Sequence, residues 1–274
     1  EANHWLKRFP GLDPDLYAQV CRNRGVYYWL NDQYSSAIKL LRRAARLLHQ
    51  QGNPFNQRAV EGTLSLAYWS AGKLSKAEIY ARRSAQAARQ LNGRGQLARV
   101  TGTLALIALF RGRLIEARRY SERHCRLAEQ LGVAIELSRA RCNRGIIMLH
   151  QGEYAAALDE IDFDRCFLEQ NYPVSEGLIP TYCNLARCYV SLGNAIKARS
   201  YAEQAMAIAQ TIGSPAPRLI TLRVLAECGP ADDCERQIAL LREALTLAEN
   251  MHRLIDEAGC LLSLAHLTND ESLW

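Results

Sequence analysis

The fold is decided by four short turn segments that recur along the chain. They are Ser70-Ala71-Gly72-Lys73-Leu74, Phe110-Arg111-Gly112-Arg113-Leu114, His150-Gln151-Gly152-Glu153-Tyr154 and Ser191-Leu192-Gly193-Asn194-Ala195. Their glycines are spaced 40, 40 and 41 residues apart, and Asp32 stands 40 residues before Gly72. Five residues after each of these positions comes an alanine: Ala37, Ala77, Ala117, Ala157 and Ala198. Self-similarity at such a period predicts a repeat architecture.

A second set of glycines lies about halfway between the turns. Gly52, Gly93, Gly132 and Gly213 each follow a run rich in Ala, Leu and Arg. We expect each to take the left-handed conformation that ends a helix. The segments between the two sets carry apolar residues at i, i+3, i+4 and i+7, as at Leu185, Ala186 and Tyr189. The pattern predicts an all-α chain.

The expected architecture is a right-handed α-α superhelix (solenoid) of about six helix pairs plus a C-terminal capping helix. We expect residues 1–274 to form a single domain, in which neighbouring pairs bury each other's apolar faces. The sixth pair is degenerate, since Asp232 and Gln237 replace the turn glycine and the alanine. Residues 171–177 are expected to form a kink or a longer loop between repeats. The predicted pairs are 17–51, 57–91, 97–131, 137–170, 177–212 and 216–250, followed by the cap at 254–268.

These positions resemble the tetratricopeptide repeat. That unit has a small residue in its first helix, then an aromatic, a turn glycine, a second aromatic and a further small residue. The first copy fits through Gly25, Tyr28, Tyr34 and Ala37, with Asp32 at the glycine position. Later copies fit through Tyr68, Gly72 and Ala77, through Gly145, Gly152, Tyr154 and Ala157, and through Ala186, Tyr189, Gly193 and Ala198. The 40-residue period is longer than the family's usual 34.

This long-repeat variety, with endings such as Leu127-Ala128-Glu129-Gln130-Leu131-Gly132, is similar to the sensor arm of MalT-type ATP-dependent bacterial transcription activators. It also resembles arms of other signal-transduction ATPases and of quorum-sensing peptide receptors. The resemblance implies a concave groove lined by the first helices. In peptide-binding relatives, Asn in this groove holds the ligand backbone and basic neighbours clamp a carboxylate. The implied groove residues are Arg22, Asn23, Trp29, Trp69, Arg99, Arg139, Asn143, Asn184 and Arg187.

Two alternatives compete with ligand binding at these positions. Trp29 and Trp69 share a register in adjacent repeats, and tryptophans at such spacing also serve as packing between repeats. The arginines either present planar donors to a carboxylate or phosphate, or pair with glutamates of the next helix.

Charge is distributed unevenly along the chain, whose net charge is +6. Residues 1–130 hold 22 Lys and Arg against 9 Asp and Glu, whereas residues 131–274 hold 12 against 19. This polarity indicates acidic partners at one end or homo-association, and well-solvated outer faces are the alternative. Basic residues such as Arg42 and Arg82 recur on second helices, but no DNA-binding motif accompanies them, so direct nucleic-acid binding is not favoured.

Other classes of chemistry lack a sequence signal. Nine cysteines occur without a CxxC pair, which favours reduced thiols in a cytoplasmic protein. No phosphate-binding glycine motif and no metal-ligand spacing is present, so we expect no cofactor and no metal. The acidic cluster at Asp159, Glu160, Asp162 and Asp164 lacks the pattern of a calcium loop. We find no apolar run of 18 residues and expect no membrane association.

The functional expectation is a non-catalytic binding module. We expect the effector- or partner-binding arm of a bacterial transcriptional or signalling regulator, with a protein, a peptide or a small acidic effector in the groove. The alternative is a scaffold or adaptor that acts through its convex face or its charge polarity. Because the chain begins Glu-Ala-Asn-His and ends at Trp274, we expect it to be a fragment of a larger protein.

Overall fold

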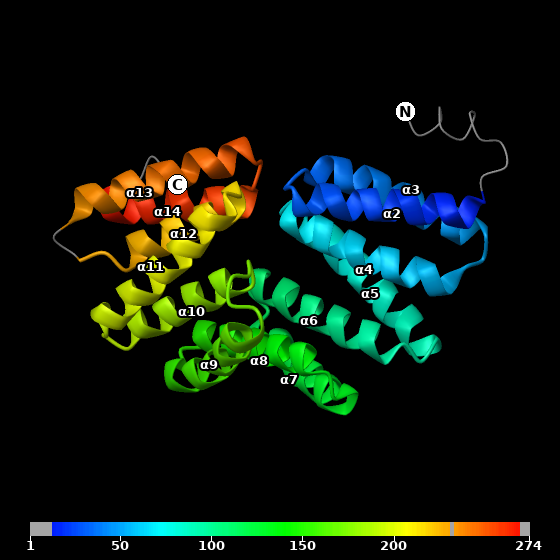
Figure 1. Cartoon of the computed structure of the whole chain (residues 1–274), viewed down its shortest axis with the longest axis horizontal. Coiled ribbons are helices and arrows are strands. Elements are labelled where there is room, and N and C mark those ends of the chain that lie inside the picture. The colour runs from blue at the N-terminus through cyan, green and yellow to red at the C-terminus, as the bar shows by residue number, and fades with distance from the viewer. Residues whose placement is uncertain (1–12, 231–232, 269–274) are drawn as a thin grey trace. The chain divides into compact units, whose positions relative to one another are not determined.

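The computed structural model describes residues 13–230 and 233–268 of the chain, and all of its regular structure there is helical (Figure 1). Of the described residues 85% are helical, and they form thirteen helices packed in consecutive pairs, which confirms the predicted all-α helical-repeat fold. The helices are α2 (Pro14–Leu30), α3 (Tyr34–Gln50), α4 (Pro54–Ser70), α5 (Leu74–Gln90), α6 (Arg94–Phe110), α7 (Leu114–Leu131), α8 (Ala134–His150), α9 (Tyr154–Asn171), α10 (Leu178–Ser191), α11 (Ala195–Ile212), α12 (Pro215–Glu227), α13 (Cys234–Asn250) and α14 (Leu254–Thr268).

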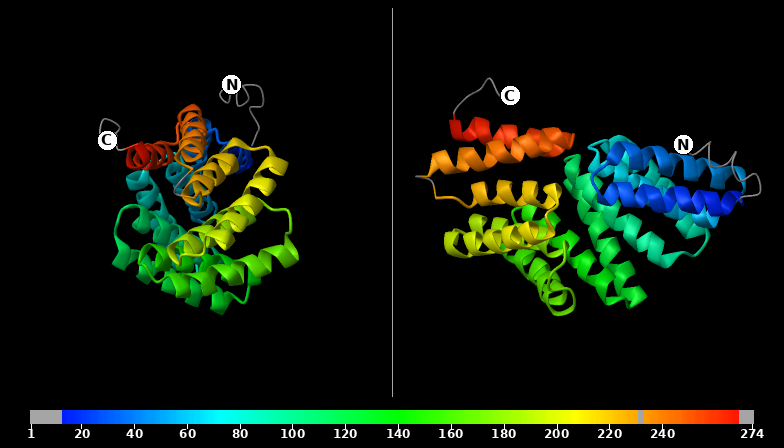
Figure 2. Two further views of the ribbon diagram at one scale, coloured as in Figure 1. Left: turned by 90° about the vertical axis from the view of Figure 1, so that its left-hand side faces the viewer. Right: turned by 45° about the horizontal axis from the view of Figure 1, so that its top comes forward.

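The chain divides into two compact units, residues 1–107 and 108–274, and the boundary falls inside α6. In the first unit, α2 packs on α3, α3 on α4 and α4 on α5. In the second unit, each helix from α7 to α14 packs on its neighbours in sequence, and α10 also contacts α8 and α12. Helices α13 and α14 lie side by side in both views of Figure 2.

The turns within the pairs form as the glycine spacing predicts. Gly72, Gly112, Gly152 and Gly193 have φ between 71° and 82°, the left-handed region in which a side chain is strained. In the first repeat Asp32 takes this conformation with φ 58°. Its carboxylate accepts a hydrogen bond from the Tyr34 hydroxyl at 2.5 Å, and such local bonding lets Asp tolerate the left-handed region.

One of the predicted helix ends is wrong. Gly52, Gly132 and Gly213 are left-handed as expected, but at the end of α5 Asn92 takes that conformation with φ 51° and Gly93 does not. The Gly93 carbonyl instead accepts the first helical hydrogen bond of α6, from the Leu97 amide at 2.9 Å. Gly93 is therefore the N-cap of the next helix, because Asn can also adopt the left-handed conformation.

Small residues let the two helices of each pair approach closely. The five alanines that follow the turns are completely buried. In the fourth pair, a Cβ at Gly145 of α8 would lie 2.6 Å from Ile161 Cγ1 of α9 and 3.0 Å from the Ala157 carbonyl oxygen. The repeat motif thus places small residues where backbones meet, and larger residues such as Ile161 fill the remaining space.

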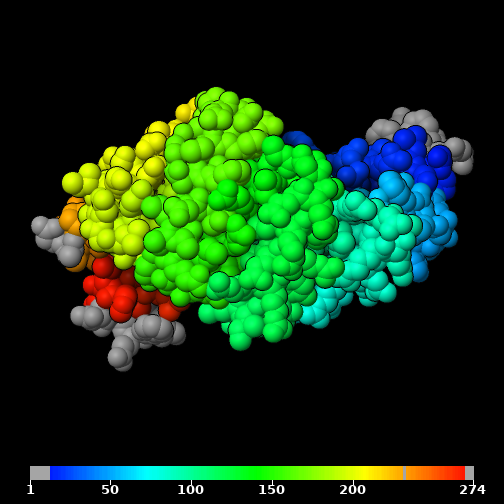
Figure 3. Space-filling view, turned by 90° about the horizontal axis from the view of Figure 1, so that it is seen from below, coloured from blue at the N-terminus to red at the C-terminus, as the bar shows by residue number. Residues whose placement is uncertain are grey.

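The largest core described in the second unit belongs to the fourth and fifth repeats. Leu178, Ile179 and Leu185 of α10 are at most 1% exposed and pack with Ile161 of α9 and Val224 of α12. Side chains cover α7 to α9 as a continuous surface in the space-filling view (Figure 3). α10 packs against α8, α9, α11 and α12, and these contacts hold it in the core of the second unit.

Two irregular regions also match the prediction. Residues 172–177 form the expected loop between α9 and α10. In the sixth pair, Gln237 is buried and its side-chain amide donates to the Pro230 carbonyl at 2.8 Å, so a polar side chain occupies the alanine position. Asp232, expected at the turn position of this pair, lies outside the described residues.

Candidate partner-binding surface

Two asparagines on first helices of the second unit combine burial with free hydrogen-bonding capacity. Asn143 of α8 and Asn184 of α10 each stand nine residues before the turn glycine of their repeat. They are only 8% and 9% exposed. Within the described part of the chain neither side-chain amide forms a hydrogen bond, and the amide atoms of both are open to solvent rather than enclosed. Each amide carries two donors and an acceptor that a bound molecule would satisfy.

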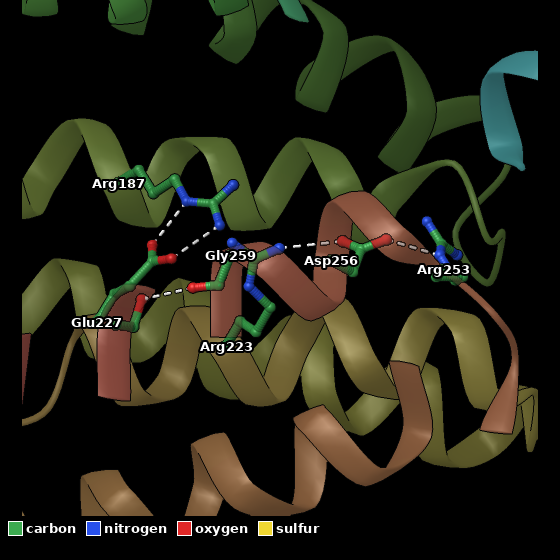
Figure 4. A network of polar contacts seen from close by, with 7 residues as sticks. Arg187, Arg223, Glu227, Arg253, Asp256 and Gly259 are labelled. Atoms are coloured by element: carbon green, nitrogen blue, oxygen red, sulfur yellow. Dashed lines mark hydrogen bonds and ion pairs between the residues drawn. The ribbon is translucent and has the colours of Figure 1, made fainter. Parts of the chain in front are cut away.

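Arg187, one turn further along α10, is already paired. Its Nε and Nη2 donate to the two carboxylate oxygens of Glu227 on α12 at 2.6 and 3.0 Å (Figure 4). Such a two-point contact fixes the guanidinium in one orientation. The structure therefore shows for Arg187 the alternative of pairing with a glutamate of the next first helix. Its partner lies 40 residues away, one repeat period along the chain.

A second ion-pair network connects α12, which carries Glu227, to α14. Arg223 Nη1 donates to Asp256 Oδ1 at 3.0 Å, and Arg253 Nε donates to Asp256 Oδ2 at 2.7 Å (Figure 4). The three side chains are 14–19% exposed. The network links the sixth repeat to the cap, and its two arginines share one carboxylate, so the part of the surface near α14 offers both signs of charge. Glu227 and Asp256 carry no signal in the repeat pattern, because they stand outside the positions that the motif specifies.

The other predicted arginines are more exposed. Arg139 on α8 is exposed, and its Nη1 donates to Glu136 Oε2 of the same helix at 3.1 Å. Glu136 is itself buried and its other oxygen contacts His124 Nε2 at 3.0 Å. Arg99 on α6 is exposed and donates to the Gln96 side chain at 3.0 Å. Both guanidinium groups remain accessible from solvent.

The first unit holds the remaining predicted residues. Trp29 of α2 is half-buried, and its indole N–H donates to Ser70 Oγ at 2.9 Å, beside Trp69 at the end of α4. This contact joins two repeats, as the packing alternative predicts. Arg22 is half-buried, and its Nε is enclosed without a hydrogen-bond partner among the described residues. Asn23 is exposed. The structure thus divides the predicted set between two units, with Asn143 and Asn184 the most buried of its polar members.

Two residues of the acidic cluster of α9 bond to neighbouring helices. Asp164 is 5% exposed and accepts hydrogen bonds from the hydroxyls of Ser138 on α8 and Thr181 on α10, the latter at 2.7 Å. Glu160 accepts from both Arg141 and Arg144 of α8. These contacts join α9 to its neighbours. Among the described residues, no three His, Cys, Asp or Glu side chains come together as metal ligands would.

The second unit also contains a small cavity between α11, α12 and α13. Its volume is about 200 Å³, and its lining includes Met206, Leu225, Cys228 and Leu240. Ligand pockets usually reach roughly 300–1,000 Å³, so this cavity does not define a site for a drug-sized ligand. Burial raises the pKa of Cys228 to about 12, and that of Cys183 to about 12. Both thiols therefore stay protonated at neutral pH and are poor nucleophiles.

Comparison with known proteins agrees with the repeat type. A tetratricopeptide repeat family model matches residues 179–212, which are α10 and α11 with their turn. A search of curated protein sequences found no match. No described helix is long and apolar enough to cross a membrane. The resemblance to tetratricopeptide repeats, read from the turn and alanine spacing, is confirmed.

Several solved structures share the fold. The Rap conjugation gene regulator of the plasmid pLS20, solved with the Phr* peptide, aligns with a TM-score of 0.77 at 15% identity, over 92% of this chain and 67% of that one. The apo quorum sensor NprR from B. thuringiensis aligns with a TM-score of 0.67 at 16% identity, over 99% and 76%. A signal transduction ATPase from Pyrococcus horikoshii with a tetratricopeptide repeat sensor aligns with a TM-score of 0.58 at 17% identity, over 99% and 43%. At such identities the likeness shows the fold, which is a tetratricopeptide-type helical repeat.

Proposed function

We propose that this chain is a non-catalytic binding module that takes an extended peptide on the first-helix surface of its second unit. The observation that carries the proposal is the pair Asn143 and Asn184, which are nine-tenths buried and have no hydrogen-bond partner in the described residues. Their amide nitrogen and oxygen atoms are not fully enclosed, so a bound molecule can reach them. A peptide backbone, with its alternating N–H and C=O groups, would satisfy both amides at once.

The comparisons support this reading by analogy. The pLS20 regulator was solved with a peptide, NprR is a quorum sensor, and the P. horikoshii protein carries its repeats as a sensor. This chain spans less than half of that last protein, so a role as the sensor arm of a bacterial cytoplasmic regulator is part of the proposal. The ion pairs at Glu227 and Asp256 place carboxylates beside arginines on this surface, which suits a peptide that carries both signs of charge.

The test begins with a library of immobilised short linear peptides, followed by calorimetry with the tightest binder. Replacing either amide removes about one to two hydrogen bonds, so Asn143→Ala and Asn184→Ala should each weaken binding about tenfold. Asn250→Ala, at an exposed position at the end of α13, is the matched control and should bind normally. Binding that survives the double substitution, or a library without any binder, refutes the proposal.

A second candidate function is an adaptor that associates with another copy of itself. On α2, Val20 and Tyr27 are 50% and 62% exposed, whereas residues at the same registers in later first helices, such as Val60 and Ile147, are at most 1% exposed. The face that later repeats bury is therefore open on α2. Residues 1–107 hold 16 Lys and Arg against 6 Asp and Glu, and residues 108–274 hold 18 against 22. Opposite net charges favour contact between unlike units of two copies.

Light scattering across salt concentrations tests the adaptor. Association should weaken with salt and should be lost in Tyr27→Glu. Ile196→Glu, at a position 86% exposed on α11, is the control and should associate like the unmodified chain. A monomer at every salt concentration eliminates this candidate.

A further inference from the structure

A buried arginine lies beside the N-terminus of α6 without a counter-ion. Arg58 of α4 is 9% exposed, and its Nη1 is fully enclosed and has no hydrogen-bond partner. Within the described residues none of its guanidinium N–H groups donates a hydrogen bond, and its charged contact is with the ring of Phe55, 4.1 Å from guanidinium carbon to ring centroid. An unpaired buried charge is costly, so buried guanidinium groups normally have an anionic partner.

The buried carboxylate one turn away does not serve Arg58. Glu61 on the same helix is 6% exposed and accepts its hydrogen bond from Gln57. The cations that lower the pKa of Glu61 are Arg83 and His49, whereas burial, the larger effect, raises it. Arg58 therefore keeps its full hydrogen-bonding capacity, although a carboxylate lies only three residues along the chain.

The guanidinium lies against the N-cap residue of α6. A Cβ at Gly93 would be 2.4 Å from Arg58 Nη1 and 2.8 Å from its Cζ, so only glycine leaves room for it there. Gly93 also has no side chain to cap the helix, unlike Asn53, whose Oδ1 accepts from the Asn56 amide at the start of α4. The amides of Gly95 and Gln96, in the first turn of α6, have no acceptor among the described residues.

A chain of hydrogen bonds holds this arrangement in place. Gln96 Nε2 of α6 donates to Ser84 Oγ of α5 at 3.0 Å, and Ser84 Oγ donates to the Arg58 carbonyl of α4 at 2.7 Å. Three helices of the first unit thus fix the free amides of α6 next to the guanidinium. Both groups are positive, because the N-terminus of a helix carries about half a positive charge. The two would repel each other unless an anion lies between them.

We propose that Arg58 and the N-terminal amides of α6 bind a phosphate group, either as the free ion or on a small phosphate monoester. A helix N-terminus with free amides is a recurrent phosphate site, and a guanidinium matches phosphate with two parallel hydrogen bonds. Phosphate offers more acceptor oxygens than a carboxylate for the converging donors. Arg94, exposed at the first position of α6, and the excess of Lys and Arg in residues 1–107 add attraction for an anion.

Thermal denaturation of the full chain in increasing phosphate, with potassium chloride holding the ionic strength constant, tests the site. Phosphate and glycerol 3-phosphate should each raise the melting temperature by several degrees with a saturable midpoint, since a ligand that binds only the folded state stabilises it. Acetate at the same ionic strength should not. Saturation by the free ion alone identifies the free ion as ligand, and saturation by both extends the site to monoesters.

The key variant is Arg58→Met, which keeps the length of the side chain and removes its charge. We expect it to lose the phosphate response while melting no lower than the unmodified chain in the absence of phosphate, because the unpaired charge is gone. Arg46→Met, at an exposed position on α3, is the matched control and should respond normally. A purely structural Arg58 would instead lower the melting temperature equally with and without phosphate.

Three results would overturn the proposal: no saturable response to phosphate, an unchanged midpoint in Arg58→Met, or an equal response to acetate. The site is independent of the peptide surface, since it lies in the first unit. Asn143→Ala and Asn184→Ala should therefore leave the phosphate midpoint unchanged, and Arg58→Met should leave peptide affinity unchanged.

Discussion

Replacing Gly145 by alanine tests the close approach of α8 and α9. In an ordinary helix interior this change stabilises by about 1 kcal/mol, because alanine has the higher helix propensity. Here the added Cβ would meet Ile161 Cγ1 at 2.6 Å and the Ala157 carbonyl oxygen at 3.0 Å. Ile161 is completely buried and the carbonyl belongs to the backbone, so neither can move away easily. Such overpacking costs about 1–3 kcal/mol, and because both neighbours are rigid we expect the upper half of that range, a net loss of about 1–2 kcal/mol.

The loss should be measured by urea and thermal denaturation followed by helical circular dichroism. For a unit of this size about 1 kcal/mol corresponds to roughly 2–4 °C, so the melting temperature should fall by roughly 2–8 °C. Gly95→Ala is the control, because a Cβ there would meet only Arg99 Nη1 at 3.9 Å. It should be neutral or stabilising. A Gly145→Ala chain as stable as the unmodified one would refute the packing argument for the motif's small residue.

Further perturbations check other parts of the structure. Burial raises the pKa of Glu61, and the hydrogen bond from Gln57 opposes this rise. The ionised carboxylate therefore destabilises the fold at pH 7. This destabilisation fades as the pH falls below the folded pKa to the unfolded value of about 4.3. Glu61→Gln should therefore raise the melting temperature at pH 7 and barely change it at pH 3.5, and equal shifts in calorimetry at both pH values would contradict this. Cys183, whose pKa burial raises to about 12, should resist iodoacetamide at pH 8 while the exposed Cys234 reacts; mass spectrometry that finds equal labelling would exclude the buried thiol. Glu227→Gln breaks the half-buried pair with Arg187 and should lower the urea midpoint by the equivalent of about 1–2 kcal/mol. Glu243→Gln, in an exposed pair with Arg218, should change the midpoint by less than about 0.5 kcal/mol. Equal effects would show that burial does not set the strength of these ion pairs.

Much of the fold could be predicted because its signals are local. A turn that needs a left-handed residue favours glycine, and the spacing of Gly72, Gly112, Gly152 and Gly193 located every pair between α4 and α11 within a few residues. The error at Gly93 has the same origin. Asn92 satisfies the same backbone requirement, so the sequence alone did not distinguish which of the two residues ends α5.

The candidate site was less accessible to sequence reasoning. The repeat register located Asn143 and Asn184, but their burial and lack of partners depend on α8 and α10 packing against their neighbours. For Arg187 the sequence left open whether it is a free donor or pairs with a glutamate, because its partner lies a full repeat away on α12. Arg58 gave no signal at all, since it differs from other arginines only in what surrounds it.

By itself, the sequence determined to within a few residues where the helices begin and end, how they pair and which small residues lie between them. These properties follow from backbone conformation and from contacts within about forty residues. The tertiary structure alone decided which charges are paired, which amides are left without partners and that Arg58 is enclosed beside α6. The physical reason is that hydrogen bonding and desolvation depend on groups that approach from other repeats, and a sequence pattern records only the chemistry of each residue.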